Sequence, residues 1–145
     1  MKAEDDPVSD DEIVLRLIWH QFHKEDDSLP IKPRAFHPRN DEATGISVFR
    51  LACVSQPVDV LAALPKIENR PLYLIAGLSV ASLRKIGLTV TPDKIEAVPG
   101  HALLGELNCN SWDTDKATWK PKVEELARIA SGNIVHRAGS KTVDG

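Results

Sequence analysis

The sequence has few cysteines and no long apolar run, and each shortage excludes a class of protein. Two cysteines, Cys53 and Cys109, stand among 145 residues. A disulfide-rich scaffold is therefore excluded; free thiols in a reducing compartment are expected, with a single disulfide as the alternative. No apolar run approaches the roughly 18 residues of a membrane-spanning helix. The N-terminus lacks the basic start and apolar stretch of a signal peptide. We therefore expect a cytoplasmic protein with no membrane partner.

Aromatic residues and basic charge are also scarce. Phe, Trp and Tyr make up 5% of the chain, so the core must consist mainly of Leu, Ile, Val and Ala. The formal net charge is -3, whereas a chain that neutralises many phosphates normally carries an excess of Lys and Arg. Nucleic acid is therefore a disfavoured partner, and another protein is the favoured one.

Length and composition indicate one globular domain. A chain of 145 residues with 42% apolar and 27% charged residues is long enough and apolar enough to bury a single core. Acidic residues crowd the first dozen positions, which favours a solvated tail over a partner-binding arm. We expect a flexible acidic tail over 1–8, a single α+β domain over 9–138 and a flexible tail over 139–145.

Short strands and short helices alternate irregularly between these limits. The run 13–19 fits either a strand or one and a half helical turns, although Ser9 and Glu12 form a capping-box pattern before it. Helices are expected from Ser55 to Pro65, after Ser79 until Gly87, and from Pro121 until Gly132. Strands are expected at 46–54, 72–76, 88–90 and 102–107, with an edge strand at 134–135. This pattern predicts an α+β fold: a small mixed β-sheet with short helices packed mainly on one face.

The first block of candidate chemistry is a proline-rich turn that leads into a strand. It runs from Pro33 to Arg39 and is followed by the apolar stretch 46–50. The basic residues Arg34, Arg39 and Arg50, with His37, could form a pocket for a phosphate or carboxylate, because arginine presents forked donors.

A structural interpretation of the same block is favoured over the pocket. In it, Phe36 anchors the proline loop on the core while the arginines pair with Asp41 and Glu42. Ser47 and Arg50 lie three apart in a strand and so point to opposite faces, which weakens any site that uses both.

The second block is Pro99-Gly100-His101-Ala102-Leu103-Leu104. Gly100 permits a close backbone approach, and His101 begins a strand. His101 and His37 together could perform acid–base chemistry, because the histidine pKa lies near neutral pH. The favoured alternative is a histidine that is hydrogen-bonded to a loop carbonyl and stabilises a turn.

Other motifs are weak. His20 and His23 share a spacing that suits metal ligands but have no third ligand at a characteristic separation. The stretch 45–49 lacks the second glycine of a nucleophile elbow, and no phosphate-binding glycine loop is present, so no cofactor is expected. The tryptophans are interpreted equally as core edges or as contact sites for a partner.

The two blocks together resemble a known pattern. Ala35-Phe36-His37-Pro38, then Gly45-Ile46-Ser47-Val48-Phe49-Arg50, and later Pro99-Gly100-His101-Ala102 are similar to an uncharacterised group of small bacterial proteins with an Ala-Phe…Gly-Ile/Leu-Ser-Val…His-Ala pattern. The resemblance covers residues 12–107 in outline. It implies a bacterial origin and a shared fold, and no activity.

The sequence supports three functional hypotheses. The leading one is a non-catalytic accessory or partner-binding module of a bacterial cytoplasmic system. The second is a small transferase or hydrolase that uses His37 and His101 as catalytic residues, with Arg34, Arg39 or Arg50 holding an anionic substrate. The third is a nucleic-acid-binding component that works through the central arginines. The enzyme hypothesis requires both histidines and an arginine to share one cleft.

Overall fold

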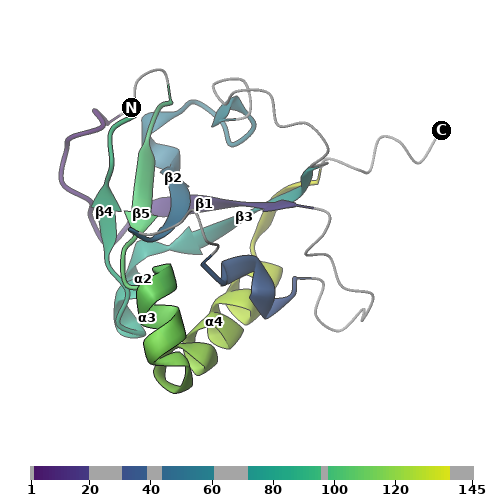
Figure 1. Cartoon of the computed structure of the whole chain (residues 1–145). Helices are drawn as coiled ribbons and strands as arrows, with labels where there is room; N and C mark the ends of the chain where they lie inside the picture. The colour runs from purple at the N-terminus through teal and green to yellow at the C-terminus, as the bar shows by residue number, and fades with distance from the viewer. Residues whose placement is uncertain (1, 20–30, 39–43, 61–71, 96–97, 138–145) are drawn as a thin grey trace, which may run out of the picture.

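The fold is built on an antiparallel sheet (Figure 1). The computed structural model describes residues 2–19, 31–38, 44–60, 72–95 and 98–137. Within them, six strands are ordered β4-β5-β2-β1-β3-β6, and each neighbouring pair is antiparallel. The α+β class is confirmed, and the sheet that the sequence predicts as mixed is antiparallel in these pairings. The strands are β1 (Ile13–Trp19), β2 (Ile46–Arg50), β3 (Leu72–Ser79), β4 (Val90–Pro92), β5 (His101–Leu104) and β6 (Ile134–Arg137).

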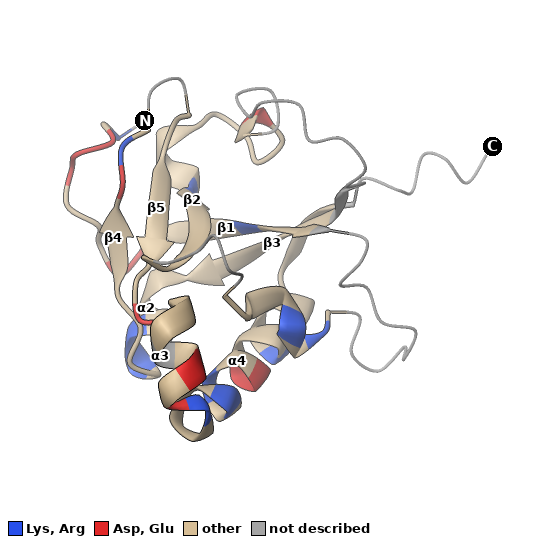
Figure 2. Cartoon of the chain, in the orientation of Figure 1, with Lys and Arg blue, Asp and Glu red and all other residues tan. Residues whose placement is uncertain are grey.

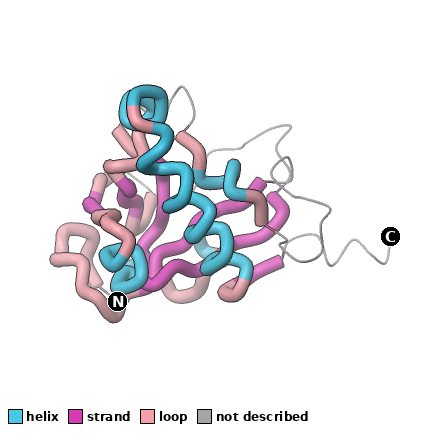
Figure 3. Tube along the Cα trace, turned by 90° about the horizontal axis from the view of Figure 1, so that it is seen from below, coloured by secondary structure: helices cyan, strands magenta, loops and turns pink. Residues whose placement is uncertain are grey.

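Helices supply one side of the main core. Their bounds are η2 (Pro33–Phe36), η3 (Leu51–Cys53), α2 (Val80–Lys85), α3 (Cys109–Thr114) and α4 (Lys116–Ser131). Buried side chains of η2, α2 and α4 pack with alternate residues of the strands, among them Val14, Ile18 and Val48. Seen from below, α4 crosses in front of the strands (Figure 3). Because η2 packs on α4, this helix fixes the position of η2, and of the residue that follows η2, relative to the sheet.

The intervening strand residues form a second cluster. Leu15, Leu17, Phe49 and Ile75 pack with residues of the connecting segments, including Val98. Because successive strand side chains point to opposite faces, Phe49 and Val48 belong to different layers. The sheet consequently has a separate hydrophobic cluster on each face, the main core and this second cluster.

The run 13–19, for which the sequence allows either a strand or a short helix, is strand β1. Several local predictions are confirmed. Ser79 caps α2 through its side chain, which accepts a hydrogen bond from the Ser82 backbone N–H at 3.3 Å. Gly132 ends α4 as expected. The predicted edge strand at 134–135 is part of β6, which is last in the strand order, beside β3.

Other boundaries differ from the expectation. The strand expected at 46–54 ends at Arg50, where η3 turns the chain. The polar stretch 109–120 forms α3 and the start of α4, because Trp112 and Trp119 pack against the main core and stabilise these helices despite their polar composition. The second half of the helix expected from Ser55 to Pro65, from position 61 on, lies outside the described residues, as do Arg39 and the predicted tail 139–145.

Candidate functional site

Arg50 lies at the end of β2, with its side chain fully buried. Nε donates to Oε1 of Glu12 at 2.9 Å, and Nη2 donates to Oε2 of Glu12 at 2.7 Å. The other donors reach the backbone carbonyls of Glu4 (3.1 Å), Asp6 (2.9 Å) and Pro7 (3.3 Å). A guanidinium has five N–H donors, so these contacts leave none for an anionic ligand. Arg50 is therefore placed differently from the substrate clamp that the sequence suggests.

Glu12 completes this buried ion pair. Burial alone would raise its pKa, but hydrogen bonds from Arg50, Lys2 and the Ser9 backbone outweigh burial and lower the pKa of Glu12 from 4.5 to about 2. The capping-box residues do interact: the Ser9 backbone N–H donates to Glu12 at 3.1 Å. They close a turn that leads into a strand, not a helix.

The N-terminal segment is held by these contacts. Lys2 donates through its backbone to the carbonyl of Ala52 at 2.8 Å and through its side chain to Glu12 at 2.9 Å. Val8 packs against the main core. This arrangement differs from the solvated tail that the charges of residues 1–8 predict, because Arg50 binds the backbone carbonyls of Glu4, Asp6 and Pro7.

His101 is 8% exposed and belongs to a hydrogen-bonded chain. Its Nδ1 lies 2.9 Å from the backbone oxygen of Asp93 and 3.1 Å from Oδ2 of the same residue. Its Nε2 lies 3.0 Å from Oγ of Ser47. The ring meets Phe49, its register partner in β2, edge to face at 5.5 Å. The contact with a loop carbonyl matches the structural interpretation of His101.

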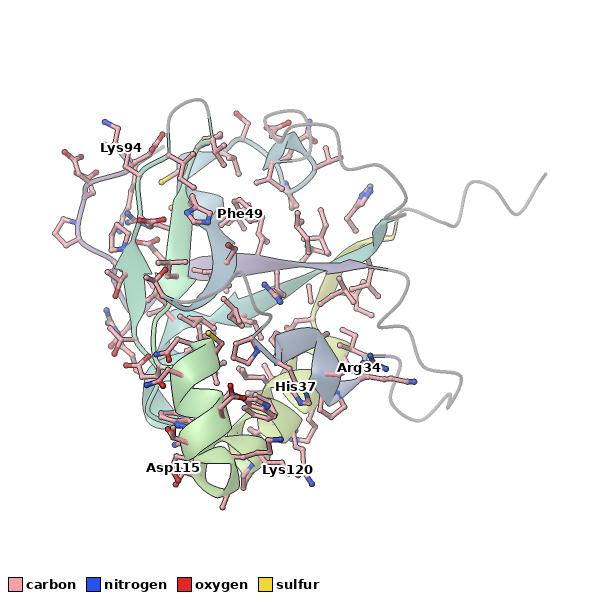
Figure 4. All side chains as sticks on the ribbon, viewed as in Figure 1. Arg34, His37, Phe49, Lys94, Asp115 and Lys120 are labelled. Carbon is pink, nitrogen blue, oxygen red and sulfur yellow. The ribbon has the colours of Figure 1, made fainter. Side chains whose placement is uncertain are left out.

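His37 follows η2 and stacks on α3. Its ring centroid lies 4.3 Å from that of Trp112. Phe36, the preceding residue, is fully buried in the main core, as the structural interpretation of the first block expects. The burial of Phe36 fixes the end of η2, so His37 is presented at the junction with the helices (Figure 4).

A pocket of about 300 Å³ opens beside His37. We call it the His37 pocket; it is lined by Lys32, Pro33, Arg34, His37, Lys120, Val123 and Glu124. Figure 4 shows Arg34, His37 and Lys120 in the same region, where η2 meets α4. Partial burial and the positive charges of Arg34, Lys116 and Lys120 all lower the pKa of His37. The pocket is therefore a region of positive potential.

The two histidines are not brought together. His101 contacts Ser47 and Phe49, and Phe49 belongs to the cluster beneath the connecting segments. His37 follows η2, which packs on α4 over the opposite face. Figure 4 shows the labelled Phe49 and His37 on opposite sides of the β1 and β3 ribbons. The enzyme hypothesis thus lacks the shared cleft that it requires. Of the predicted arginines, Arg34 lines the His37 pocket, Arg50 is buried with Glu12, and Arg39 lies outside the described residues.

Some important residues were not predicted from the sequence. Arg16, 6% exposed, donates to the backbone oxygen of Ala35 at 2.8 Å and of Ser47 at 2.8 Å, and so ties η2 to the sheet. A charged residue inside the apolar run 13–19 was the available signal. Lys116 and Lys120 lie four apart on α4, a spacing that places them on one helix face. Asp93 gave no local signal, because its partnership with His101 depends on the pairing of β4 and β5.

Comparisons with known proteins return no match to a family model, to a curated protein or to a solved structure. Within the described residues, no three His, Cys, Asp or Glu side chains lie close enough to hold a metal ion. In the same part of the chain, every helix is too short or too polar to cross a bilayer. A functional assignment therefore depends on the fold and on the geometry of its residues.

Proposed function

We propose that this chain is a partner-binding module, and that its His37 pocket binds an acidic segment of another protein. The single observation that supports this proposal is an apolar floor inside a cationic rim. Pro33 offers apolar surface, and the basic residues Lys32, Arg34 and Lys120 surround it. Burial lowers the pKa of His37, and the neighbouring charges of Arg34, Lys116 and Lys120 lower it further.

The dimensions favour a short peptide segment. A volume of about 300 Å³ is at the lower limit of small-molecule sites, so it accommodates one or two side chains more readily than a nucleotide cofactor. An apolar side chain of the partner would contact Pro33, while flanking carboxylates would meet Lys120 and Arg34. Charged rims of this kind steer association and set specificity more than they raise affinity.

The rigidity of the rim supports binding by a preformed surface. Lys116 and Lys120 project from the first turns of a 16-residue helix that is anchored by Val123 and Leu126 in the core. The Lys116 ammonium lies 5.7 Å from the Trp112 ring centroid, which restricts the lysine beside His37. A fixed surface loses less conformational entropy when a partner binds.

The distribution of acidic residues favours a protein partner over nucleic acid. Glu124 lines the pocket itself, and Figure 2 shows acidic residues of α3 and α4 beside the basic ones. Carboxylates interleaved in this way repel an extended phosphate backbone, whereas a short acidic segment can avoid them. The free thiols of Cys53 and Cys109 support a reducing compartment such as the cytoplasm as the place of this encounter.

The test is binding of a fluorescein-labelled peptide with four Asp or Glu residues around one Leu, followed by fluorescence anisotropy. We expect saturable binding to the full chain that weakens as salt rises, because salt screens exposed charges. Lys116→Glu and Lys120→Glu should each weaken binding by about tenfold or more, which corresponds to the loss of one or two charge contacts.

Lys94→Glu is the matched control, because Lys94 is an exposed lysine near β4, away from α4 (Figure 4). It makes the same change in net charge and should leave binding unchanged. If all three variants weaken binding equally, the net charge of the protein explains the effect, and the proposal is contradicted. A single-stranded oligonucleotide that binds more tightly than the peptide and competes with it would favour the nucleic-acid hypothesis instead.

A further inference from the structure

A second feature lies on the other face of the sheet: the hydrogen-bonded chain Ser47–His101–Asp93. Ser47 Oγ lies 3.0 Å from Nε2 of His101, and Oδ2 of Asp93 lies 3.1 Å from Nδ1. The three residues come from β2, the first position of β5 and the residue after β4. Strand pairing in register positions them, so the geometry does not depend on a long loop.

The direction of each hydrogen bond is set by the partners of His101. Nδ1 meets the backbone carbonyl of Asp93 at 2.9 Å and its carboxylate, and both oxygens can only accept. Nδ1 therefore carries the proton. In the neutral ring Nε2 then holds the lone pair, so the Ser47 hydroxyl donates to it. This is the polarity of a nucleophile, its general base and an orienting carboxylate.

The serine end of the chain is reachable from solvent. Ser47 is half-buried, whereas the ring of His101 is almost fully covered by its neighbours, Phe49 among them. Opposite Ser47 in the register stands Leu103, which is half-buried, and opposite Leu103 stands the exposed Thr91 of β4. These side chains share one face of the sheet. A small ligand can therefore approach Ser47 across the β4 edge while the base stays fixed.

We propose that Ser47 is an activated nucleophile that attacks small carboxylic esters, with His101 as its base and Asp93 as a positioning residue. Oγ forms a bond to the carbonyl carbon while its proton passes to Nε2. The bond to the leaving alcohol then breaks, and that alkoxide takes the proton from Nε2. His101 then takes a proton from water as the water oxygen bonds to the acyl carbon. The bond between that carbon and Oγ breaks, Oγ takes the proton back from Nε2, and the acid is released.

The ester class is inferred from the surroundings of Ser47. In the described residues, the side-chain contact of Ser47 is this base, and no donor is assigned to a developing oxyanion. A site of this kind lacks the electrostatic stabilisation that amide cleavage demands. Esters with a good leaving group need less of it. The half-buried Leu103 beside the hydroxyl suits a short apolar acyl group.

The proposal is tested by labelling the full-length protein with a fluorophosphonate and locating the adduct by peptide mass spectrometry. The Oγ–P bond forms and fluoride leaves, so a reaction at Ser47 is a stable mass increase. We expect one adduct, on Ser47, absent in Ser47→Ala. His101→Gln should slow labelling by about 100-fold or more, within the range of general-base contributions. Ser55→Ala removes an exposed serine that is not part of the hydrogen-bonded chain Ser47–His101–Asp93, and it should not change the labelling of Ser47.

Asp93→Asn separates a positioning role from a structural one. The Asp93 side chain is 46% exposed, so the variant should fold, and the backbone carbonyl still holds the tautomer of His101. Labelling should therefore slow by about tenfold, less than in His101→Gln. In the unsubstituted protein, the rate of labelling should also fall on acidification, because a protonated imidazole cannot accept the serine proton.

Several outcomes would overturn the inference. The first is a folded protein that takes up no label on Ser47, and the second is an adduct on Ser55. The third is a labelling rate that is the same in the unsubstituted protein and in Asp93→Asn, both at neutral and at acidic pH. The last result stays decisive even if the Ser47 or His101 variants do not fold. Lys120→Glu should leave labelling unchanged, so failure of the His37 pocket proposal and failure of this one are distinguishable.

Discussion

At the scale of single residues, the buried guanidinium of Arg50 donates its hydrogen bonds to protein oxygens. A buried guanidinium is stable when its charge is paired and every donor is satisfied, and the carboxylate of Glu12 with three backbone carbonyls meets both conditions. Lys2 adds a second cation on the same carboxylate. One carboxyl group, that of Glu12, therefore balances the charge of both Arg50 and Lys2.

Replacement of Glu12 by Gln tests this dependence. The substitution leaves the guanidinium of Arg50 buried without a counter-charge, and breaking a buried pair in this way costs about 3–5 kcal/mol. Urea denaturation should show that loss in the free energy of unfolding. Asp10→Asn is the control, because Asp10 pairs with Arg84 on the surface and the expected loss is below about 0.5 kcal/mol. Equal losses in the two variants would contradict a special role for Glu12.

The pH dependence of stability has a definite sign. The pKa of Glu12 is lowered on folding to about 2 from 4.5, so the folded state favours the charged form. The resulting stabilisation, about 3 kcal/mol, is complete above about pH 4.5 and disappears as the pH falls towards 2. Denaturation at a series of acidic pH values should show this decline in the full chain. Glu12→Gln should lack that part of the decline, and an identical pH profile would exclude Glu12 as its cause.

His37 reports the charge of its pocket. Burial lowers its pKa, and Arg34, Lys116 and Lys120 lower it further. Lys120→Met should therefore raise the pKa of His37, although it stays below the ordinary value because burial persists. A titration of the imidazole Cε1–H signal by NMR measures the change, with Lys94→Met as a control that should leave the signal unaltered. If the pKa of His37 is unchanged in Lys120→Met, Lys120 does not contribute to the positive charge around His37.

At the scale of elements, the turn before β5 closely approaches the end of β2. Gly100 has a φ of +74°, and its carbonyl accepts the Arg50 backbone N–H at 2.8 Å. A Cβ at this position would lie 2.9 Å from the Arg50 carbonyl oxygen and 3.0 Å from Cβ of Cys53. The sequence prediction of a close backbone approach at Gly100 agrees with this geometry.

Gly100→Ala should therefore be strongly destabilising. The alanine meets both an unfavourable left-handed backbone and backbone atoms that cannot move independently, and we expect a loss of about 2 kcal/mol or more. Thermal denaturation measures it. Gly132→Ala is the matched control: its φ is -90°, and the nearest atom to a new Cβ would be 3.6 Å away, so the change should be near zero. A tolerated Gly100→Ala would indicate that the turn can rearrange.

The elements also show what local sequence can predict. Ser79 with the α2 spacing and Gly132 at the end of α4 are recognisable because cap and stop signals act within one turn of helix. The stretch 109–120 was not recognisable, because Trp112 and Trp119 gain their helical partners from the distant core. The pairing of His101 with Ser47 and Asp93 depends on strand register across 54 and 8 positions, which no local pattern encodes. The sequence predicts a cationic pocket of Arg34, His37, Arg39 and Arg50; of these, Arg34 and His37 line the observed pocket, and its lysines were not predicted.

At the scale of the whole molecule, the N-terminal segment contacts the end of β2, η3 and the main core. Residues 2–12 lie against Arg50 at the end of β2 and against Ala52 in η3, and Val8 reaches the main core. Within residues 2–8, the Asp5 side chain is exposed. These residues are thus held through the backbone carbonyls that bind Arg50 and through the side chain of Lys2, which binds Glu12.

Deletion of residues 1–8 tests whether this segment is structural. The deletion removes the carbonyls of Glu4, Asp6 and Pro7 and the ammonium of Lys2, and so leaves donors of a fully buried guanidinium without acceptors. We expect the free energy of unfolding to fall by about 2–4 kcal/mol, the range for unsatisfied buried groups that carry charge. Asp5→Asn keeps every carbonyl and should lose less than about 0.5 kcal/mol. If the truncated chain matches the full chain in urea denaturation, residues 1–8 are a solvated tail, and Arg50 must find its acceptors in water.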